Sequence, residues 1–344
     1  MKKQYIYSID NLRGLAILLV FFTHCQSFNL FDSLFQDFAK FFVGNATAIF
    51  VFISGFLFHY LQSKNFNFKK YLKQKSKFVI TPYLFFISIA TIIGLFFHVN
   101  EYYQLTNLQF IIWSLSVGGT VVAPLWFIPM ICLFFLTAPV FISISKVSLK
   151  IMTVITVVSI ILSLITDRPF SQYNPFLSYI HFLGFYMLVV YLSASHKVRE
   201  GLYSHYQLVY ALTITFFYIL LGFYLYTRYV NGSETYGFIN SFGKFNLIQG
   251  GKLCMTILLF VAFEHYFNHK NKVLGFFSHI SFGIFFIHGF MLIIFSKLVN
   301  QWQLTDHPFL LLILETIFGL GGSVLLIEIG KKILGNRSRY VLGC

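Results

Sequence analysis

Residues 42–62 read FVGNATAIFVFISGFLFHYLQ and contain no Asp, Glu, Lys or Arg. A helix that spans a lipid bilayer needs about 20 mostly apolar residues, and this stretch has that length. Other apolar runs of similar length lie before and after it, so the sequence predicts a helical membrane protein with about ten spans. The predicted spans are 12–31, 42–62, 79–98, 125–143, 150–166, 175–194, 208–229, 248–267, 279–299 and 308–330.

The composition of the whole chain also indicates that lipid is its main solvent. Of its 344 residues, 57% are hydrophobic and only 10% are charged, and the mean hydropathy is +0.75. Soluble proteins carry about 25% charged residues, enough to cover a surface that faces water. We therefore expect one all-α bundle over residues 1–344, without a soluble extracytoplasmic domain. The apolar stretch 107–118 is too short to span and is expected to form an interfacial or re-entrant helix.

The basic residues predict the orientation of the bundle. Of the 25 Lys and Arg residues, 18 lie at the two ends of the chain or after the second, fourth, sixth and eighth predicted spans. Six lie on the opposite side, and Arg13 lies within the first span. Cytoplasmic loops of membrane proteins are enriched in Lys and Arg, so ten spans with both termini in the cytoplasm are predicted.

Several other classes of protein are disfavoured. The net charge of +14 comes from short clusters between apolar runs, without a zinc finger or an aromatic RNA-binding signature, so we expect no nucleic-acid partner. The four cysteines are scattered without metal-ligand spacing, and no metal site is expected. The first apolar run holds Arg13 and His24 and has no small-residue cleavage site after it, so it is expected to be a retained helix and not a signal peptide.

The first predicted helix carries the densest group of polar residues. Asp10 and Arg13 are three residues apart and can pair on one helical face. Arg13 and His24 are eleven residues apart, which is about three helical turns and a rise of about 16 Å, so both point to one face. Ionisable residues inside a membrane are costly and usually functional. The alternatives are that Arg13 is a snorkelling anchor and that His24 is an interhelical hydrogen-bonding residue.

Polar residues in other spans are weaker candidates. Ser54, which a glycine follows, fits a small-residue packing notch better than a functional role. His288 lies near mid-depth and is either a core histidine or a functional one. Glu328 ends the last span beside Lys331 and Lys332, and it either has a role or forms an interfacial salt bridge. Glu315 is deeper in the same helix, and the sequence suggests no partner for it.

Five segments along the chain together form a pattern. They are Asp10-x-x-Arg13-Gly14-x-Ala16 with Arg13-x10-His24, Phe52-Ile53-Ser54-Gly55-Phe56-Leu57, Leu125-Trp126-Phe127-Ile128, Ser281-Phe282-Gly283-Ile284-Phe285 with His288, and Ile327-Glu328. On these segments the chain resembles bacterial membrane acyltransferase family 3, the O-acyltransferases of cell-surface glycans. One departure concerns the Arg-x-x-Arg pair that the family usually has before its third helix, because the nearest match here is Lys70-x-x-Lys73. Lysine supplies charge without the bidentate fork of arginine.

The resemblance implies a transferase in the bacterial cytoplasmic membrane. Such proteins take an acyl group, usually acetyl, from cytoplasmic acyl-CoA and deliver it to a sugar hydroxyl at the outer face. The expected co-substrate is therefore acyl-CoA, with acetyl-CoA foremost, and no bound cofactor is expected. The expected partners are membrane lipid, a glycan acceptor (a surface polysaccharide, lipopolysaccharide or lipid-linked sugar) and proteins of glycan assembly.

This reading assigns roles to the candidate residues. A sugar hydroxyl is a poor nucleophile, so acyl transfer needs a general base, and the ordinary histidine pKa of about 6.5 suits His24 to that role. Arg13, with Asp10 beside it, completes the catalytic group. Arg13, Lys70 and Lys73 are expected to bind the phosphates of acyl-CoA. The supporting residues are Ser54, Trp126, His288 and Glu328.

Two other functions remain open at the level of sequence. One is export of a polysaccharide or lipid-linked sugar, because some relatives are associated with such export. A transporter would be expected to show internal repeats and helices broken at matching positions, and neither is evident. The other is a sensor or assembly partner, which no feature favours. The sequence leaves undecided the acyl group, the acceptor sugar and its position, the oligomeric state and whether a covalent acyl-protein intermediate forms.

Overall fold

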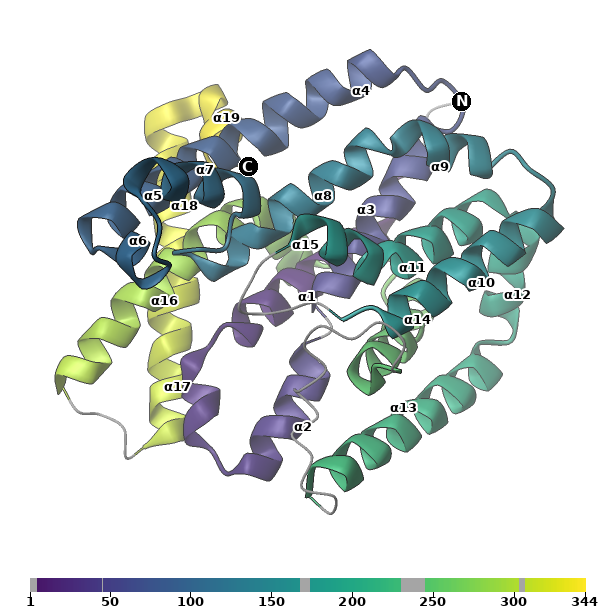
Figure 1. The fold of residues 1–344 in the computed structure, drawn as a ribbon. Helices are drawn as coiled ribbons and strands as arrows, with labels where there is room; N and C mark the ends of the chain where they lie inside the picture. The colour runs from purple at the N-terminus through teal and green to yellow at the C-terminus, as the bar shows by residue number, and fades with distance from the viewer. Residues whose placement is uncertain (1–4, 45, 168–173, 230–244, 303–306) are drawn as a thin grey trace.

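The computed structural model describes residues 5–44, 46–167, 174–229, 245–302 and 307–344, and within them every regular element is a helix (Figure 1). This agrees with the predicted all-α class. Lys2, Lys3, Arg168 and Lys244, which contribute to the predicted orientation, lie outside these residues. The first half of the bundle comprises α1 (Tyr7–Thr23), η1 (Gln26–Leu30), α2 (Ser33–Val43), α3 (Ala46–Gln62), α4 (Phe68–Lys75), η2 (Ser76–Ile80), α5 (Thr81–Phe96), α6 (Val99–Tyr102), α7 (Asn107–Val117), η3 (Ala123–Trp126), α8 (Phe127–Leu136) and α9 (Ala138–Ile144).

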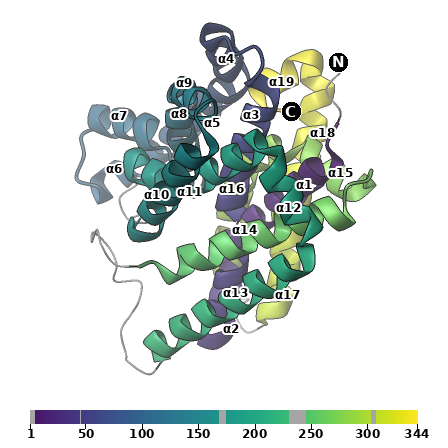
Figure 2. The same ribbon diagram turned by 90° about the vertical axis from the view of Figure 1, so that its right-hand side faces the viewer.

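The second half contains the longest helices. They are separated by short segments, several of which are themselves helical. It comprises α10 (Leu149–Ile165), α11 (Pro175–Ala194), α12 (His196–Ser204), α13 (Tyr206–Tyr229), α14 (Leu247–Tyr266), α15 (Lys272–His279), α16 (Ser281–Trp302), α17 (Pro308–Thr316), η5 (Ile317–Gly321), α18 (Gly322–Leu334), η6 (Gly335–Arg337) and α19 (Ser338–Val341). Figure 2 shows that α18 and α19 lie at the same end of the bundle as α4.

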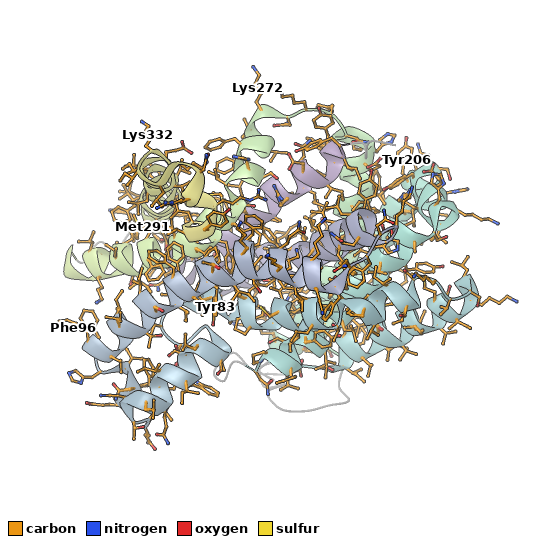
Figure 3. The ribbon with its side chains drawn as sticks, turned by 90° about the horizontal axis from the view of Figure 1, so that it is seen from above. Tyr83, Phe96, Tyr206, Lys272, Met291 and Lys332 are labelled. Atoms are coloured by element: carbon orange, nitrogen blue, oxygen red, sulfur yellow. The ribbon has the colours of Figure 1, made fainter. Side chains whose placement is uncertain are left out.

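The predicted number of about ten spans is not confirmed. Within the described residues, seven helices are long and apolar enough to cross a membrane, and an eighth is added if the bent pair α8–α9 counts as one span. The predicted spans 12–31 and 150–166 correspond to α1 and α10, which have 17 residues each. The cytoplasmic location of both termini stays a prediction. Figure 3 shows Lys272 and Lys332, both predicted to be cytoplasmic, pointing away from the helices at the rim of the bundle.

Two predicted spans are interrupted, each for a local reason. The prediction of one helix over 12–31 is wrong because α1 ends at Thr23 and the amides of Gln26 and Ser27 donate to Glu315 instead of continuing the helical ladder. The predicted span 125–143 bends by 52° between α8 and α9, where Pro139 cannot donate a backbone hydrogen bond.

The segment of lysines after the second predicted span is a helix and not an irregular loop. α4 continues through the π-helical turn η2 into α5, so that Phe68–Phe96 is a single stretch of helix. The predicted short helix at 107–118 is present as α7.

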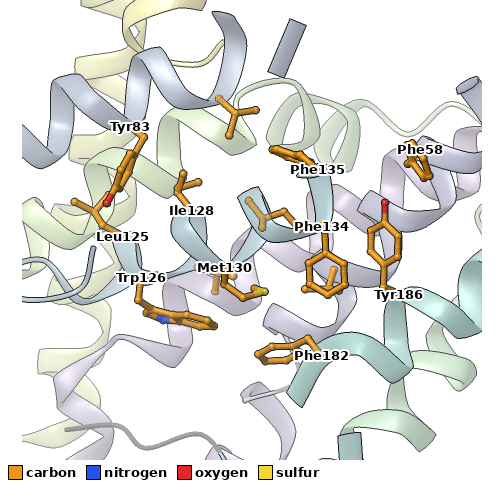
Figure 4. Close-up of a cluster of buried hydrophobic side chains, with 14 of the residues drawn as sticks. Phe58, Tyr83, Leu125, Trp126, Ile128, Met130, Phe134, Phe135, Phe182 and Tyr186 are labelled. Atoms are coloured by element: carbon orange, nitrogen blue, oxygen red, sulfur yellow. The ribbon is translucent and has the colours of Figure 1, made fainter. Parts of the chain in front are cut away.

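The centre of the bundle is built around α1 and α11. α1 packs against α3, α14, α15 and α16, while α11 packs against α3, α8 and α10. Small residues allow close approach between these helices, as is usual in membrane bundles. A Cβ on residue 55 would collide with Val189 and Tyr186, so Gly55 lets α3 lie directly on α11. Aromatic side chains fill the space around these contacts, among them Phe134, Phe182 and Tyr186 (Figure 4).

Candidate functional site

Three polar side chains form a group that we call the Arg13 cluster: Asp10 and Arg13 from the first half of α1, and Ser278 from α15. The Nε atom of Arg13 donates to Oγ of Ser278 at 2.8 Å, and that hydroxyl donates to Oδ1 of Asp10 at 2.6 Å. A guanidinium nitrogen of Arg13 also lies 3.5 Å from the same carboxylate oxygen, which confirms that Asp10 and Arg13 pair. Their side chains are 20% and 30% exposed, so the cluster is reached from the surface of the bundle.

The Arg13 cluster joins α1 to α15, which lies beside it in Figures 1 and 2. Gly14 makes this contact close, because a Cβ at residue 14 would collide with the carbonyl oxygen of Leu274. Earlier in α1, Oγ of Ser8 donates to Glu264 at 2.6 Å. The side chain of Asn11 donates to two backbone carbonyls of the segment between α14 and α15, at 2.7 and 2.9 Å. The polar residues at this end of α1 therefore have partners and hold the helix in place.

His24 lies at the other end of α1, where it is the C-cap residue. Its backbone amide donates to the carbonyl of Phe21 at 3.0 Å, and the chain leaves the helix after it. The centre of its ring lies 5.5 Å from that of His288 in α16. Two histidines that the sequence identified in separate helices are thus brought side by side.

A pocket opens beside His24, and we call it the His24 pocket. Its empty volume is about 440 Å³, part of which is open to the exterior. Four segments of the chain that are distant in sequence contribute its walls. The lining residues are Val20, His24, Thr47, Phe50, Pro124, Trp126, Phe127, Ser281, Phe282 and Phe285.

The walls of the His24 pocket combine aromatic rings with a few polar side chains. The polar ones are His24, Thr47, Trp126 and Ser281. A mostly apolar pocket with a small number of converging polar groups is the usual form of a small-molecule site. His24, Trp126 and Ser281 come from three of the five segments that the sequence analysis singled out, and they now face one space.

His288 is fully buried, and its ring lies near those of two lining residues, His24 and Phe285. Its Nδ1 atom lies 2.7 Å from the carbonyl oxygen of Ile284, which fixes that nitrogen as the donor. Its Nε2 atom must then be an acceptor, and in the described part of the chain it has no hydrogen-bond partner. A buried nitrogen without a partner carries a desolvation cost of about 1–3 kcal/mol, so it requires an explanation.

Trp126 forms one wall of the His24 pocket and is 6% exposed. Its indole stacks near Phe182 of α11, with ring centres 6.1 Å apart, and Figure 4 shows the two side chains beside Met130. Because these neighbours belong to the aromatic core, the position of the indole is fixed by packing and not by the pocket itself.

Two of the predicted supporting residues lie away from the pocket. α3 lines the pocket through Thr47 and Phe50, whereas Ser54 is about one turn beyond Phe50, next to the packing contact of Gly55. Glu328 is 46% exposed and lies 3.1 Å from Lys331, which is the interfacial salt bridge that the sequence offered as the alternative to a functional role.

The two lysines of the predicted donor site are also separate from the Arg13 cluster. Lys70 and Lys73 are exposed on α4. The backbone amide of Lys70 donates to the side chain of Asn67, which caps α4. Because lysine and arginine are both cations without an acceptor, no direct bond between these lysines and Arg13 is expected, and their role in phosphate binding stays a prediction.

Some residues of the site could not have been identified from the sequence. Ser278 joins Asp10 to Arg13 but lies 265 residues after Arg13, in a short amphipathic helix without a distinctive motif. Thr47 was an ordinary residue of an apolar run. Glu315 was noticeable in the sequence because it is a carboxylate in an apolar helix. Its partners, the backbone amides of Gln26 and Ser27, could not be identified from the sequence.

Comparison with known protein families gives one match. Residues 6–328 match the family model described as an acyltransferase domain. The matched region begins just before α1 and ends at Glu328, so it contains the Arg13 cluster and every residue that lines the His24 pocket. No curated protein and no solved structure matches the chain significantly.

Proposed function

Because the chain belongs to membrane acyltransferase family 3, we propose that it moves an acyl group, with acetyl foremost, from cytoplasmic acyl-CoA to a hydroxyl of a cell-surface or lipid-linked glycan. Its place would be the bacterial cytoplasmic membrane. The observation that carries this proposal is the His24 pocket, where a histidine, an indole and a serine from separate parts of the chain line one cavity.

In the proposed reaction, His24 is the general base. The acceptor hydroxyl gives its proton to the imidazole as its oxygen attacks the carbonyl carbon of the thioester. The carbon–sulfur bond then breaks, and the thiolate of coenzyme A leaves and takes up the proton. The result is an oxygen ester and free coenzyme A. His24 suits this role because histidine ordinarily titrates near neutral pH.

Arg13 is the proposed contact for the phosphates of acyl-CoA. It lies about 16 Å from His24 along the axis of α1. That separation suits an elongated donor with phosphates at one end and a thioester at the other. Asp10 and Ser278 occupy part of the guanidinium and hold it in one orientation. Phosphate binding would therefore use the remaining nitrogens, with Lys70 and Lys73 as further sources of positive charge.

His288 is proposed to support the base. Its buried Nε2 acceptor lies in a ring whose centre is 5.5 Å from that of His24. At this place Nε2 could accept a hydrogen bond from the imidazole of His24. The cost of leaving it without a partner would then be recovered during the reaction.

The experiment that tests the function is mass analysis of the surface glycan from cells with and without the gene. Loss of an ester-linked acyl group, with the glycan itself still present, is the expected result. Loss of the glycan from the surface would instead favour the exporter that the sequence left as an alternative. A second arm supplies radiolabelled acetyl-CoA to isolated membranes and follows the label into the glycan.

A further inference from the structure

Glu315 is a buried carboxylate that the proposed reaction does not use. It lies in α17, is 1% exposed, and its two oxygens accept from two consecutive backbone amides. Oε1 lies 2.8 Å from the amide nitrogen of Gln26, and Oε2 lies 3.0 Å from that of Ser27. Figure 1 shows α17 alongside the segment that follows α1. Hydrogen bonds to a charged acceptor are about twice as strong as neutral ones.

The two amides belong to the first turn of η1. The first amides of a helix have no partner within the helix and are usually satisfied by a side chain just before it. Here the residue before η1 is Cys25, which makes no such hydrogen bond. Glu315 therefore performs the capping from a different helix, and the interaction joins η1 to α17 across the bundle.

This contact determines how the chain leaves α1. His24 is the C-cap residue of α1, and η1 begins only two residues later, at Gln26. On the preceding side, the hydroxyl of Thr23 lies 2.8 Å from the carbonyl oxygen of Leu19 in α1 and 3.1 Å from that of Val43, so this end of α1 is in contact with α2. The short turn that carries His24 is thus held from both sides.

We propose that Glu315 is a positioning residue for His24. It fixes the backbone of Gln26 and Ser27, and so it holds the imidazole against the His24 pocket. The inference rests on the proposed function, in which His24 is the base. A displacement of about 1 Å at a reacting group can lower a rate by about 10²-fold, so a contact two residues away is sufficient to matter.

The test compares Glu315→Gln with Glu315→Asp in purified, detergent-solubilised protein. Glutamine has the shape of glutamate but has only one acceptor oxygen for two amides, and its NH₂ group opposes the second amide. We expect kcat to fall by about 10²-fold while KM for acetyl-CoA changes little, because the donor phosphates lie at the other end of α1. Aspartate keeps the charge but is one methylene shorter, so it should restore part of kcat. The matched control is Glu264→Gln, which removes an acidic contact from the opposite end of α1 and should leave kcat near the wild-type value.

A double variant separates failure of this inference from failure of the proposed function. If Glu315 acts through His24, then adding Glu315→Gln to His24→Gln should cause no further loss beyond that of His24→Gln alone. Multiplied losses, or an unchanged kcat in Glu315→Gln, would overturn the positioning role and leave His24 as the base. Wild-type activity in His24→Gln would instead overturn the role of His24 as the base, on which this inference rests. If Glu315→Gln does not accumulate, the Asp variant still decides: a fall in kcat at unchanged KM supports positioning, and a proportional rise in KM contradicts it.

Discussion

At the beginning of α1, the side chains of Ser8, Asn11 and Arg13 donate to partners in α14, in α15 and in the segment between them. At its end, His24 faces a pocket and lies beside His288, whose buried Nε2 atom has no partner in the described residues. One end thus uses polar groups to hold the helix, whereas the other retains an acceptor whose burial is unfavourable. Chemistry at the second end would account for this cost.

The largest effect on activity is expected from His24, at the end of α1. His24→Ala should lower kcat by about 10²–10⁴-fold, the usual contribution of a general base, and leave binding of acyl-CoA near normal. Ester formation from labelled acetyl-CoA in membranes with matched protein levels measures this. The control is His196→Ala, since His196 is an exposed histidine of α12 that pairs with Glu200. An equal loss in the control would contradict the distinction between the two histidines.

Variants of the Arg13 cluster show whether the polar residues at the beginning of α1 also bind acyl-CoA or only hold α1 in place. Arg13→Ala should raise KM for acyl-CoA by about 10–100-fold, because a hydrogen bond to a charged group contributes about 1.5–3 kcal/mol. Arg13→Lys should restore part of the affinity for acyl-CoA, since lysine carries the positive charge but lacks the bidentate geometry of the guanidinium. Ser278→Ala removes the joining hydroxyl but keeps the guanidinium, so its KM should change much less. If Ser278→Ala reproduces the full effect of Arg13→Ala, then Arg13 serves only to join α1 to α15.

A substitution of His288 should affect activity and stability differently. In His288→Leu the buried nitrogen without a partner is replaced by an apolar side chain, a change that is often neutral or stabilising. We expect activity to fall by about tenfold, the value of one hydrogen bond, while the unfolding temperature is unchanged or higher. Thermal unfolding in detergent and the transfer assay measure the two quantities. Retained activity together with a marked loss of stability would identify His288 as a core residue.

The smallest effect on activity is expected from Ser8. Ser8→Ala removes one hydrogen bond to Glu264, whose other oxygen still accepts from Asn268. The free energy of unfolding should fall by about 1 kcal/mol, and kcat should not change. Denaturant titration of the purified protein and the transfer assay follow the two effects. A large fall in kcat without a change in stability would show that the polar residues at this end also take part in the reaction.

The sequence predicted those parts of the fold that depend on local composition. Most of the apolar runs form helices, because a backbone in lipid must satisfy its hydrogen bonds within the helix. The break after Thr23 could not be predicted, since it depends on a carboxylate 289 residues away from Gln26. The bend before α9 was signalled by Pro139 but was not expected, because proline is often tolerated in membrane helices.

The candidate site was predicted as a set of residues but not as an arrangement. Asp10 and Arg13 were expected to pair because they lie one turn apart, and they do. The proximity of His24, Trp126 and His288 depends on how three distant helices pack, which hydropathy does not encode. For the same reason, Ser54 and Glu328 matched a motif without lying at the pocket.

The central claim is that His24 transfers a proton and does not merely pack. Glutamine at this position keeps a hydrogen-bonding group of similar length but cannot act as a base at neutral pH. The measurement is the acyl-ester content of the surface glycan in a His24→Gln strain, with the amount of protein in the membrane matched to the wild type. We expect the ester to be nearly absent. An ester content near that of the wild type would mean that His24 is a packing residue, and the catalytic assignment would then move to His288.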